Sequence, residues 1–301
     1  MKILLTGRDG QLGFELVRAL APLGEVLAVG RADCDLDDAG ALRTLVRRLA
    51  PDVIVNPAAY TAVDRAESEP DLAFAVNAGV PGILGEEAAR LGSLVVHYST
   101  DYVFDGAGQA PYTEADTPAP HSVYGSSKLA GERALAHACA RHLILRTSWV
   151  LGAHGGNFAK TMLRLAAERD ALSVVDDQVG APTSAALLAD LTAHLVRQYA
   201  RADRDAFPYG TYHVAAAGET SWYEYARFVL DAARAAGRPL RAGLDGVRPV
   251  STAAFPTAAR RPANSRLDTR LFRGTFGLRL PPWQEGVREV LRHILRSEHD
   301  A

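Results

Sequence analysis

A tyrosine and a lysine four positions apart are the residues of this chain best suited to acid–base chemistry. Tyr124 and Lys128 occur in the run Tyr124-Gly-Ser-Ser-Lys128, at the start of a predicted helix, so both side chains share one helical face. A nearby ammonium lowers the pKa of a phenol from about 10, and such a phenol can donate a proton to a carbonyl as hydride arrives. The lysine can also hold the ribose of a nicotinamide. A helix-surface pair without chemistry is the alternative, although the chain has only three lysines and few such pairs would arise by chance.

A hydroxyl pair supports the same chemistry. Ser99 and Thr100 close a predicted strand, at the carboxyl edge where parallel sheets bind ligands. The Thr100 hydroxyl can bond the carbonyl oxygen that Tyr124 protonates. A Ser or Thr here would otherwise be expected to bond the local backbone. Together, the three side chains favour a catalytic set of Thr100, Tyr124 and Lys128.

A glycine-rich turn near the start of the chain is typical of dinucleotide binding. Gly7, Gly10 and Gly13 are spaced G-x-x-G-x-x-G between a predicted strand and a predicted helix. Glycines there permit a tight turn and a close approach of the backbone to a pyrophosphate, which the helix N-terminus also favours. A purely structural turn is the alternative.

The residues at the end of the second predicted strand indicate which dinucleotide is bound. An acidic residue there would bind the ribose hydroxyls of NAD, but the chain has Gly30 followed by Arg31. Arginine pairs well with a 2′-phosphate, so we expect NADPH, with Arg8 as a second contact and NADH as the alternative cofactor. If both arginines are solvated surface residues, this preference disappears.

The elements that must position these residues alternate between strand and helix. Strands are expected at 2–6, 25–29, 53–55, 94–98 and 143–146, and helices at 11–20, 36–49, 72–91 and 124–139. Continuous apolar strands separated by helices indicate a parallel sheet covered on both faces. The expected fold is therefore α/β, with a Rossmann-type doubly wound parallel sheet.

The pattern loosens after residue 150. Helices are expected at 158–168, 187–198, 223–235 and 285–295, with strands at 173–175 and 211–214 and several prolines between them. We expect a dinucleotide-binding Rossmann domain at 1–150, with returning segments near 184–215. Residues 151–301 would then form mainly a smaller substrate-binding lobe.

Composition excludes several classes of protein. A net charge of −2 gives no basic field for nucleic acid or an anionic membrane. No apolar run suits a signal peptide or a transmembrane helix, and the two cysteines, Cys34 and Cys139, suggest reduced thiols in a cytoplasmic protein. The nine histidines show no zinc-binding spacing, and the acidic residues at 33–38 suit a loop or helix cap. We expect no metal requirement, no nucleic acid and no membrane.

Eight motifs are spread from Met1 to about Leu295. They are Gly7–Gly13, Asn56–Asp64, His97–Phe104, Tyr124–Lys128, Arg146–Trp149, Asn157–Met162, Asp177–Thr183 and Ala259–Ser265. Together they resemble the extended short-chain dehydrogenase/reductases and, within them, the dTDP-4-dehydrorhamnose reductases. The first motifs mark the superfamily, and the later ones are more specific.

The resemblance implies an NADPH-dependent oxidoreductase that reduces the C4 ketone of dTDP-4-dehydro-β-L-rhamnose to dTDP-β-L-rhamnose for cell-surface polysaccharide. It implies the catalytic set Thr100, Tyr124 and Lys128. It implies cofactor contacts at Gly10, Gln11, Leu12, Asp35, Leu36, Ala59, Tyr60, Thr61 and Tyr98, beside Gly7, Gly13, Arg31, Tyr124 and Lys128. Sugar contacts would be Thr100, Asp101, Tyr124 and Trp149. Arg260 or Arg261 would suit the substrate diphosphate, with packing or surface roles as the alternative.

Several questions stay open from the sequence. Some family members dimerise through magnesium held by glutamates, but beside Glu15 the aligned positions here are Ala186 and His293, so a metal-bridged dimer is in doubt and a homodimer of another kind remains an option. Another nucleotide 4-keto sugar is an alternative substrate. A non-catalytic regulatory subunit of the methionine adenosyltransferase type, or an epimerase or dehydratase, are alternatives with other activities.

Overall fold

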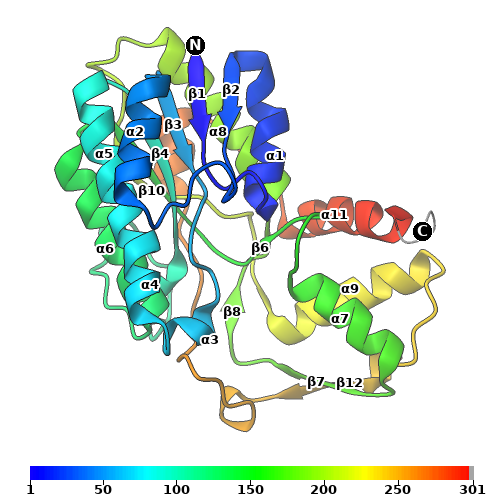
Figure 1. Ribbon diagram of the computed structural model, residues 1–301. Coiled ribbons are helices and arrows are strands. Elements are labelled where there is room, and N and C mark those ends of the chain that lie inside the picture. The colour runs from blue at the N-terminus through cyan, green and yellow to red at the C-terminus, as the bar shows by residue number, and fades with distance from the viewer. Residues whose placement is uncertain (298–301) are drawn as a thin grey trace.

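A parallel sheet forms the centre of the larger part of the molecule (Figure 1). The computed structural model describes residues 1–297, and within them six strands pair in the order β10-β5-β4-β3-β1-β2, all parallel. The Rossmann-type α/β fold predicted from the sequence is confirmed. The strands are β1 (Lys2–Leu5), β2 (Glu25–Ala28), β3 (Val53–Asn56), β4 (Leu94–Thr100), β5 (His142–Thr147) and β10 (Gly210–His213).

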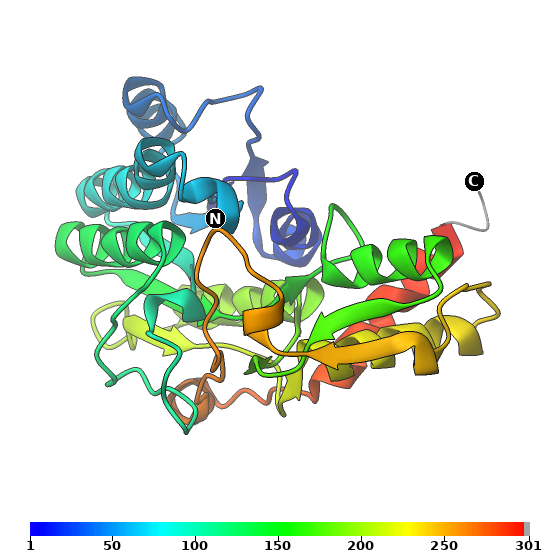
Figure 2. The ribbon, with the colours of Figure 1, turned by 90° about the horizontal axis from the view of Figure 1, so that it is seen from below.

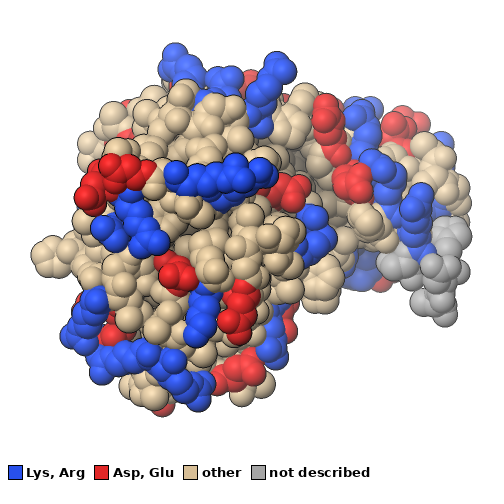
Figure 3. All heavy atoms as spheres, turned by 90° about the horizontal axis from the view of Figure 1, so that it is seen from above, with Lys and Arg blue, Asp and Glu red and all other residues tan. Residues whose placement is uncertain are grey.

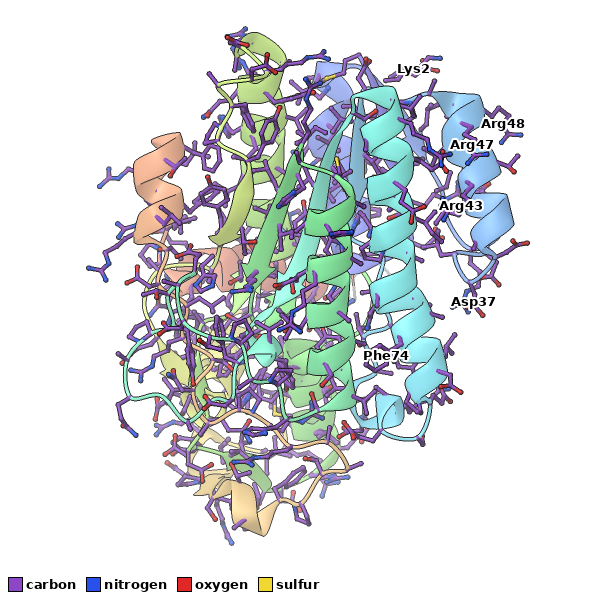
Figure 4. The ribbon with its side chains drawn as sticks, turned by 90° about the vertical axis from the view of Figure 1, so that its left-hand side faces the viewer. Lys2, Asp37, Arg43, Arg47, Arg48 and Phe74 are labelled. Atoms are coloured by element: carbon purple, nitrogen blue, oxygen red, sulfur yellow. The ribbon has the colours of Figure 1, made fainter. Side chains whose placement is uncertain are left out.

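Helices cover both faces of this sheet, because each presents an apolar stripe to it. On one face α1 (Gln11–Leu20) buries Leu12, Leu16 and Leu20, which recur every four residues and pack in one core with residues of α8 (Ala185–Arg201). The other face is covered by α2 (Ala39–Leu49), α5 (Val80–Leu91) and α6 (Val123–Ala138) (Figure 4). Strand β4 lies between the two layers and is buried along its whole length.

A buried carboxylate ties α2 to α5. Glu87 is 1% exposed, and it accepts hydrogen bonds from Arg47 at 2.7 Å and from Arg43 at 3.0 Å. The Arg47 guanidinium holds the pKa of Glu87 at about 2, against the opposing effect of burial. Figure 4 shows Arg43 and Arg47 on α2, and Asp37 just before it. These bonds hold helices α2 and α5 together on one face of the sheet, next to the loop that follows β2.

A second part of the molecule has its own core. It is built from α7 (Phe158–Glu168), α9 (Trp222–Ala235) and α11 (Trp283–Ser297), beside the parallel pair β7 (Leu172–Val175) and β12 (Val247–Val250). Seen from below, the segment after β12 returns toward the sheet (Figure 2). There Arg261 pairs with Asp64 at 2.5 Å.

Several short elements had no counterpart in the sequence prediction. Helices α3 (Val63–Ala66) and α10 (Arg270–Phe276) are of this kind. The short strands are β6 (Val150–Leu151), β8 (Val179–Gly180), β9 (Thr183–Ser184) and β11 (Thr220–Ser221), and the short helical turns are η1 (Ala21–Leu23), η3 (Asp101–Val103), η4 (Leu244–Gly246) and η5 (Thr252–Ala254).

The continuous helix predicted at 72–91 is confirmed, but its middle has π-helical rather than α-helical bonding. The chain forms α4 (Pro70–Phe74), then a π-helical segment η2 (Ala75–Gly79), then α5. Asn77 in the π segment is buried, and its amide bonds the backbone N and O of Tyr60 at 2.8 and 3.0 Å and the Ser127 hydroxyl at 3.0 Å. These bonds account for the locally widened turn. The helix predicted from residue 36 begins at Ala39 instead, since the Asp38 side chain accepts from Ala41 N and caps it.

Basic and acidic side chains are mixed on the face seen from above (Figure 3), in keeping with a net charge of −2. None of the helices in residues 1–297 combines the length and apolar composition needed to cross a lipid bilayer.

Candidate active site

A cavity of about 630 Å³ lies along the carboxyl ends of the central strands. It brings together residues that follow β1, β2, β3, β4 and β5, which is where ligands of an open parallel sheet bind. Most of the residues singled out from the sequence line it: Gly7, Gly10, Gln11, Leu12, Gly13, Arg31, Asp35, Leu36, Ala59, Thr61, Tyr98, Thr100, Asp101, Tyr124, Lys128 and Trp149.

The glycine turn is shaped for close approach. Gly7 has φ +61°, and a Cβ on it would lie 3.0 Å from the backbone of Ala58. A Cβ on Gly13 would lie 2.0 Å from the Gly7 oxygen, so α1 packs directly on the turn. The N-terminus of α1 has no side-chain cap, which leaves its first amides for an anion. The turn therefore fits the pyrophosphate of a dinucleotide.

We predict that Gly13→Ala weakens NADPH binding by about tenfold or more, because the methyl group must displace the backbone of the turn. Fluorescence titration with NADPH measures the affinity. Gly274→Ala is the matched control, since a Cβ there meets nothing within 4 Å. Equal NADPH affinity in Gly13→Ala and wild type would show that the close packing of α1 on the turn is not needed for binding.

Charges of both signs surround the adenosine end. Arg8 Nη1 pairs with Asp33 at 2.9 Å and donates to the Ala28 oxygen at 3.1 Å. The Asp9 carboxylate lies over Gly30, where a Cβ would be 2.2 Å from Oδ2. Arg31 is exposed at the edge of the cavity. Arg8 is thus partly neutralised by Asp33, and Arg31 is better placed to meet a 2′-phosphate.

Thr100, a member of the predicted catalytic set, ends β4. Thr100 caps η3 by accepting from Tyr102 N at 3.2 Å, and its hydroxyl donates to Asp101 Oδ1 at 3.0 Å. Burial raises the pKa of Asp101 to about 6, although hydrogen bonds from Ser265 and Thr100 oppose the shift. Asp101 Oδ2 is buried and has no hydrogen-bond partner among the described residues.

Tyr124 stands beside Thr100, but its titration differs from the sequence expectation. Burial raises its pKa above the usual value, and a hydrogen bond with Thr100 only partly opposes this. The expected lowering of this pKa by Lys128 is wrong: the pKa is raised, and the Lys128 ammonium lies against the Tyr98 oxygen and His97. A phenol with a raised pKa is protonated at neutral pH but is a weaker acid, so it can donate only to an oxygen that gains negative charge as hydride arrives.

The Lys128 ammonium is buried below the cavity floor. It is 2% exposed, donates to the Tyr98 backbone oxygen at 2.7 Å, and lies 3.3 Å from His97 Nε2. Burial lowers its pKa to about 8, while the charge of Glu132 acts in the opposite direction. The lysine is therefore poised to lose its charge just above neutral pH.

An aromatic wall closes the sugar end. Trp149 has φ +47°, a left-handed backbone that is rare for a bulky residue and marks a constrained site. Its ring stacks on Trp222 with centroids 3.7 Å apart, and Gly180 is so close that a Cβ would be 2.8 Å from the indole. The Trp149 side chain is thus held rigidly at the edge of the cavity.

The two predicted substrate arginines line a second cavity of about 520 Å³. Arg261 is bound there by Asp64 and by the Tyr102 hydroxyl at 3.1 Å, whereas Arg260 is exposed. Tyr102 contacts one residue of each cavity, since its hydroxyl accepts from Arg261 and its ring lies edge-on to Tyr124 with centroids 5.5 Å apart.

Besides the two arginines, the predicted cofactor contacts Arg8 and Tyr60 do not line the main cavity, and sequence reasoning missed other lining residues. Tyr60 is absent from the lining because its hydroxyl turns to Glu69 at 2.5 Å. Ser148 and Thr147 line the cavity from the end of β5, and the run Arg146–Trp149 was the signal that could have pointed to them. The residues beneath Lys128 gave no recognisable spacing. Further lining residues that sequence reasoning did not assign are Asp9, Cys34, Val76, Gly155 and Gly156.

Among residues 1–297 no group of three or more His, Cys, Asp or Glu side chains is arranged to hold a metal ion. The arrangement can bind a dinucleotide along the turn and present a proton donor, a hydroxyl and an ammonium at its far end. That combination suits reduction of a carbonyl.

Comparison with known proteins gives a consistent result. The family model described as RmlD substrate binding domain matches residues 1–296. The chain is 52% identical over 301 residues to the dTDP-4-dehydrorhamnose reductase of Escherichia coli (strain K12), covering 99% of each chain. A dTDP-4-dehydrorhamnose reductase structure from Clostridium acetobutylicum ATCC 824 has a TM-score of 0.88 and 37% identity, covering 97% of this chain and 99% of that one. One from Bacillus anthracis str. Ames, in complex with NADP, has a TM-score of 0.88 and 36% identity, covering 97% and 98%.

Proposed function

This chain belongs to the dTDP-4-dehydrorhamnose reductase family, and we propose from that premise how its own residues carry out the reaction. The protein is an NADPH-dependent oxidoreductase that reduces the C4 ketone of dTDP-4-dehydro-β-L-rhamnose to dTDP-β-L-rhamnose, in dTDP-rhamnose biosynthesis. The observation that carries the residue assignment is that one cavity joins the glycine turn to Thr100, Tyr124 and Lys128.

The cofactor is held by the turn and the loops beside it. Gly7–Gly13 cradle the pyrophosphate, Asp35 and Leu36 flank the adenosine half, and Ala59, Thr61 and Tyr98 face the nicotinamide half. When bound, NADPH supplies the hydride. Tyr60 acts from outside the cavity, through its backbone bonds with Asn77.

At the sugar, Tyr124 donates its phenolic proton to the C4 oxygen, and Thr100 orients that oxygen with its hydroxyl. Two N–H groups of the Lys128 ammonium face the Tyr98 oxygen and His97, and the third is left to stabilise the phenolate that forms when Tyr124 gives up its proton. Asp101 accepts a sugar hydroxyl through its unpartnered Oδ2, and Trp149 forms a flat wall for the ring. Each role uses a side chain that the structure places on the cavity.

The site of reduction can be tested with NADPH labelled with deuterium at the transferred position of its nicotinamide ring. We expect one deuterium at C4 of the sugar, found by NMR of the purified product. Deuterium at another carbon, or an unlabelled product, would contradict C4 reduction. Nucleotide 4-keto sugars with other stereochemistry, used in parallel, measure how strictly the cavity selects its substrate.

We predict that Arg31→Ala raises KM for NADPH by about tenfold and leaves KM for NADH nearly unchanged, since a charged hydrogen bond to the 2′-phosphate is lost. Steady-state kinetics with both cofactors provide the comparison. Arg48→Ala is the control, because Arg48 is exposed on α2 (Figure 4) and does not line the cavity. Equal effects on the two cofactors would remove Arg31 as the source of the preference.

We predict that Arg260→Ala raises KM for the sugar nucleotide by about tenfold with little change in kcat, because a guanidinium in the second cavity suits a diphosphate. KM for NADPH in the same variant is the internal control. Arg261→Ala is less clean, since it also breaks the contacts with Asp64 and Tyr102. An unchanged sugar-nucleotide KM in Arg260→Ala would retire this role.

Localisation, oligomeric state and domain boundaries are further parts of the proposal. We propose a cytoplasmic protein that works without a metal or nucleic acid, as a monomer or a homodimer. Residues 1–150 form the dinucleotide-binding domain together with segments near 184–215, where α8 packs on α1 and β10 pairs with β5. Residues 151–301 supply mainly the substrate lobe, and the last four of them lie outside the described residues.

A further inference from the structure

A row of buried polar side chains leads away from Lys128 beneath the sheet's carboxyl edge. His97 Nε2 lies 3.3 Å from the Lys128 Nζ, and His97 Nδ1 lies 3.0 Å from the Asn56 side-chain amide. The Thr6 hydroxyl bonds the other end of that amide at 2.6 Å. Each of these residues is at most 2% exposed. Nothing in the reaction described so far uses Thr6, Asn56 or His97.

The strands set this row. Thr6 directly follows β1, Asn56 ends β3, and His97 lies in β4, opposite Asn56 in the parallel register. Lys128 approaches His97 from α6. Because three adjacent strands and one helix supply the row, its geometry is fixed by the sheet rather than by a loop.

Burial keeps the His97 ring neutral. Full burial and the neighbouring Lys128 charge both hold the pKa of His97 well below its usual range. A neutral imidazole has one donor and one acceptor nitrogen, so Nε2 can accept from the ammonium only if Nδ1 carries the ring proton. In that tautomer Nδ1 would donate to the Asn56 oxygen, which requires the Asn56 amide to be turned over from its orientation in the structure, where the nitrogen faces Nδ1 and the oxygen accepts from Thr6.

The structure itself has the opposite set of bonds, in which the Thr6 hydroxyl donates to the Asn56 oxygen and the Asn56 nitrogen donates to His97 Nδ1. With the Asn56 nitrogen toward Nδ1, as the structure has it, the ring proton lies on Nε2 and points at a neutral lysine amine. The two arrangements differ by an amide flip and a shift of the ring proton. The row can therefore satisfy Lys128 in either charge state, whereas a fixed acceptor could serve only the ammonium.

Other groups near Lys128 do not replace this contact. From α6 itself come Tyr124 and Glu132, and from β4 come His97 and the Tyr98 backbone. Arg146 on β5 binds Glu132 in a buried pair with Nη2 to Oε2 at 2.6 Å, which holds that carboxylate away from the lysine. His97 is the one side chain for which the structure shows a polar contact with the Lys128 ammonium in the described residues.

We propose that His97 is a positioning residue for the reduction: its Nε2 accepts from the Lys128 ammonium, and with the Tyr98 oxygen it aims the remaining N–H at the cavity. Asn56 and Thr6 set which ring nitrogen accepts. This inference rests on the proposed function of Lys128 beside Tyr124. It predicts that the alkaline loss of activity depends on the acceptor at position 97.

Two amide variants distinguish the role of His97 Nε2 as a hydrogen-bond acceptor from the role of the His97 side chain in packing. In His97→Gln the amide oxygen reaches the place of Nε2, whereas in His97→Asn the shorter amide reaches only Asn56. We expect kcat of His97→Gln to stay within about threefold of wild type and kcat of His97→Asn to fall about tenfold or more, the scale of one lost hydrogen bond to a charged group. The alkaline limb of kcat/KM should move about one pH unit lower in His97→Asn alone.

Equal losses in the two variants would assign His97 to packing, and wild-type behaviour of His97→Asn would overturn the proposal. Thermal unfolding of both variants shows whether either is misfolded.

A second experiment, ¹⁵N NMR of the His97 ring in the wild-type protein, needs no substrate. We expect the ring proton on Nδ1 at neutral pH and on Nε2 above about pH 8, where Lys128 loses its charge. A ring proton that stays on Nε2 throughout would overturn the contact, even if wild type turns over its sugar nucleotide. If the wild-type protein fails to reduce its sugar nucleotide but the ring proton shifts as expected, the proposed function is rejected and the contact between Lys128 and His97 stands.

Discussion

Tyr124→Phe is expected to lower kcat by about a hundredfold or more, because it removes the one proton that the structure places beside Thr100. The phenyl ring fills the same space, so NADPH affinity and thermal stability should stay close to wild type. Measuring kcat, the NADPH dissociation constant and Tm on the same preparation separates lost chemistry from lost binding.

Tyr102→Phe is the matched control for that variant. Tyr102 lies edge-on to Tyr124, but its hydroxyl faces Arg261 in the second cavity. We expect its loss to change KM for the sugar nucleotide more than kcat. If Tyr124→Phe keeps most of its kcat, the proton comes from another group, and Asp101, with its pKa raised to about 6, is the next candidate.

Lys128→Met is expected to lower kcat by about a hundredfold or more and to weaken NADPH binding as well, because the ammonium serves both Tyr124 and the nicotinamide ribose. Methionine has a similar length and carries no charge to desolvate, so the fold should survive the change. Lys2→Met is the control, since Lys2 lies at the start of β1 on the exposed surface (Figure 4). Wild-type kinetics in Lys128→Met would remove the ammonium from the mechanism.

The same lysine predicts a pH profile. Burial lowers the pKa of Lys128 to about 8, so its ammonium is present below that pH and is lost as the pH rises through it. Activity should therefore fall above about pH 8, and this limb should be absent from Lys128→Met. An alkaline limb of the same midpoint in the variant would assign it to another group.

The parts of the site that depend on local spacing were predictable. The glycine turn is specified by residues within seven positions, and α1 begins and ends where its apolar period indicated. Tyr124 and Lys128 share a helical face because α6 is regular there. Each of these features is set by neighbours in sequence, so no knowledge of the tertiary fold was needed.

Features that depend on long-range contacts were not predictable. The Lys128 ammonium contacts the Tyr98 oxygen and His97, 30 and 31 positions away. The π-helical segment before α5 accompanies the bonds of Asn77 to Tyr60 and Ser127. Arg261 was assigned to the substrate, but an ion pair with Asp64, 197 positions away, already holds it. Such partners are brought together only by the folded sheet and its returning segments.

The most direct test of the account is oxidation of NADPH by the purified wild-type protein with enzymatically generated dTDP-4-dehydro-L-rhamnose, followed by the loss of NADPH absorbance. We predict rapid oxidation in amounts equal to the sugar nucleotide added, and none when the sugar nucleotide is omitted. A folded protein that binds NADPH yet oxidises none of it with this substrate would contradict the account. The search would then turn to other nucleotide keto sugars, and next to a regulatory role.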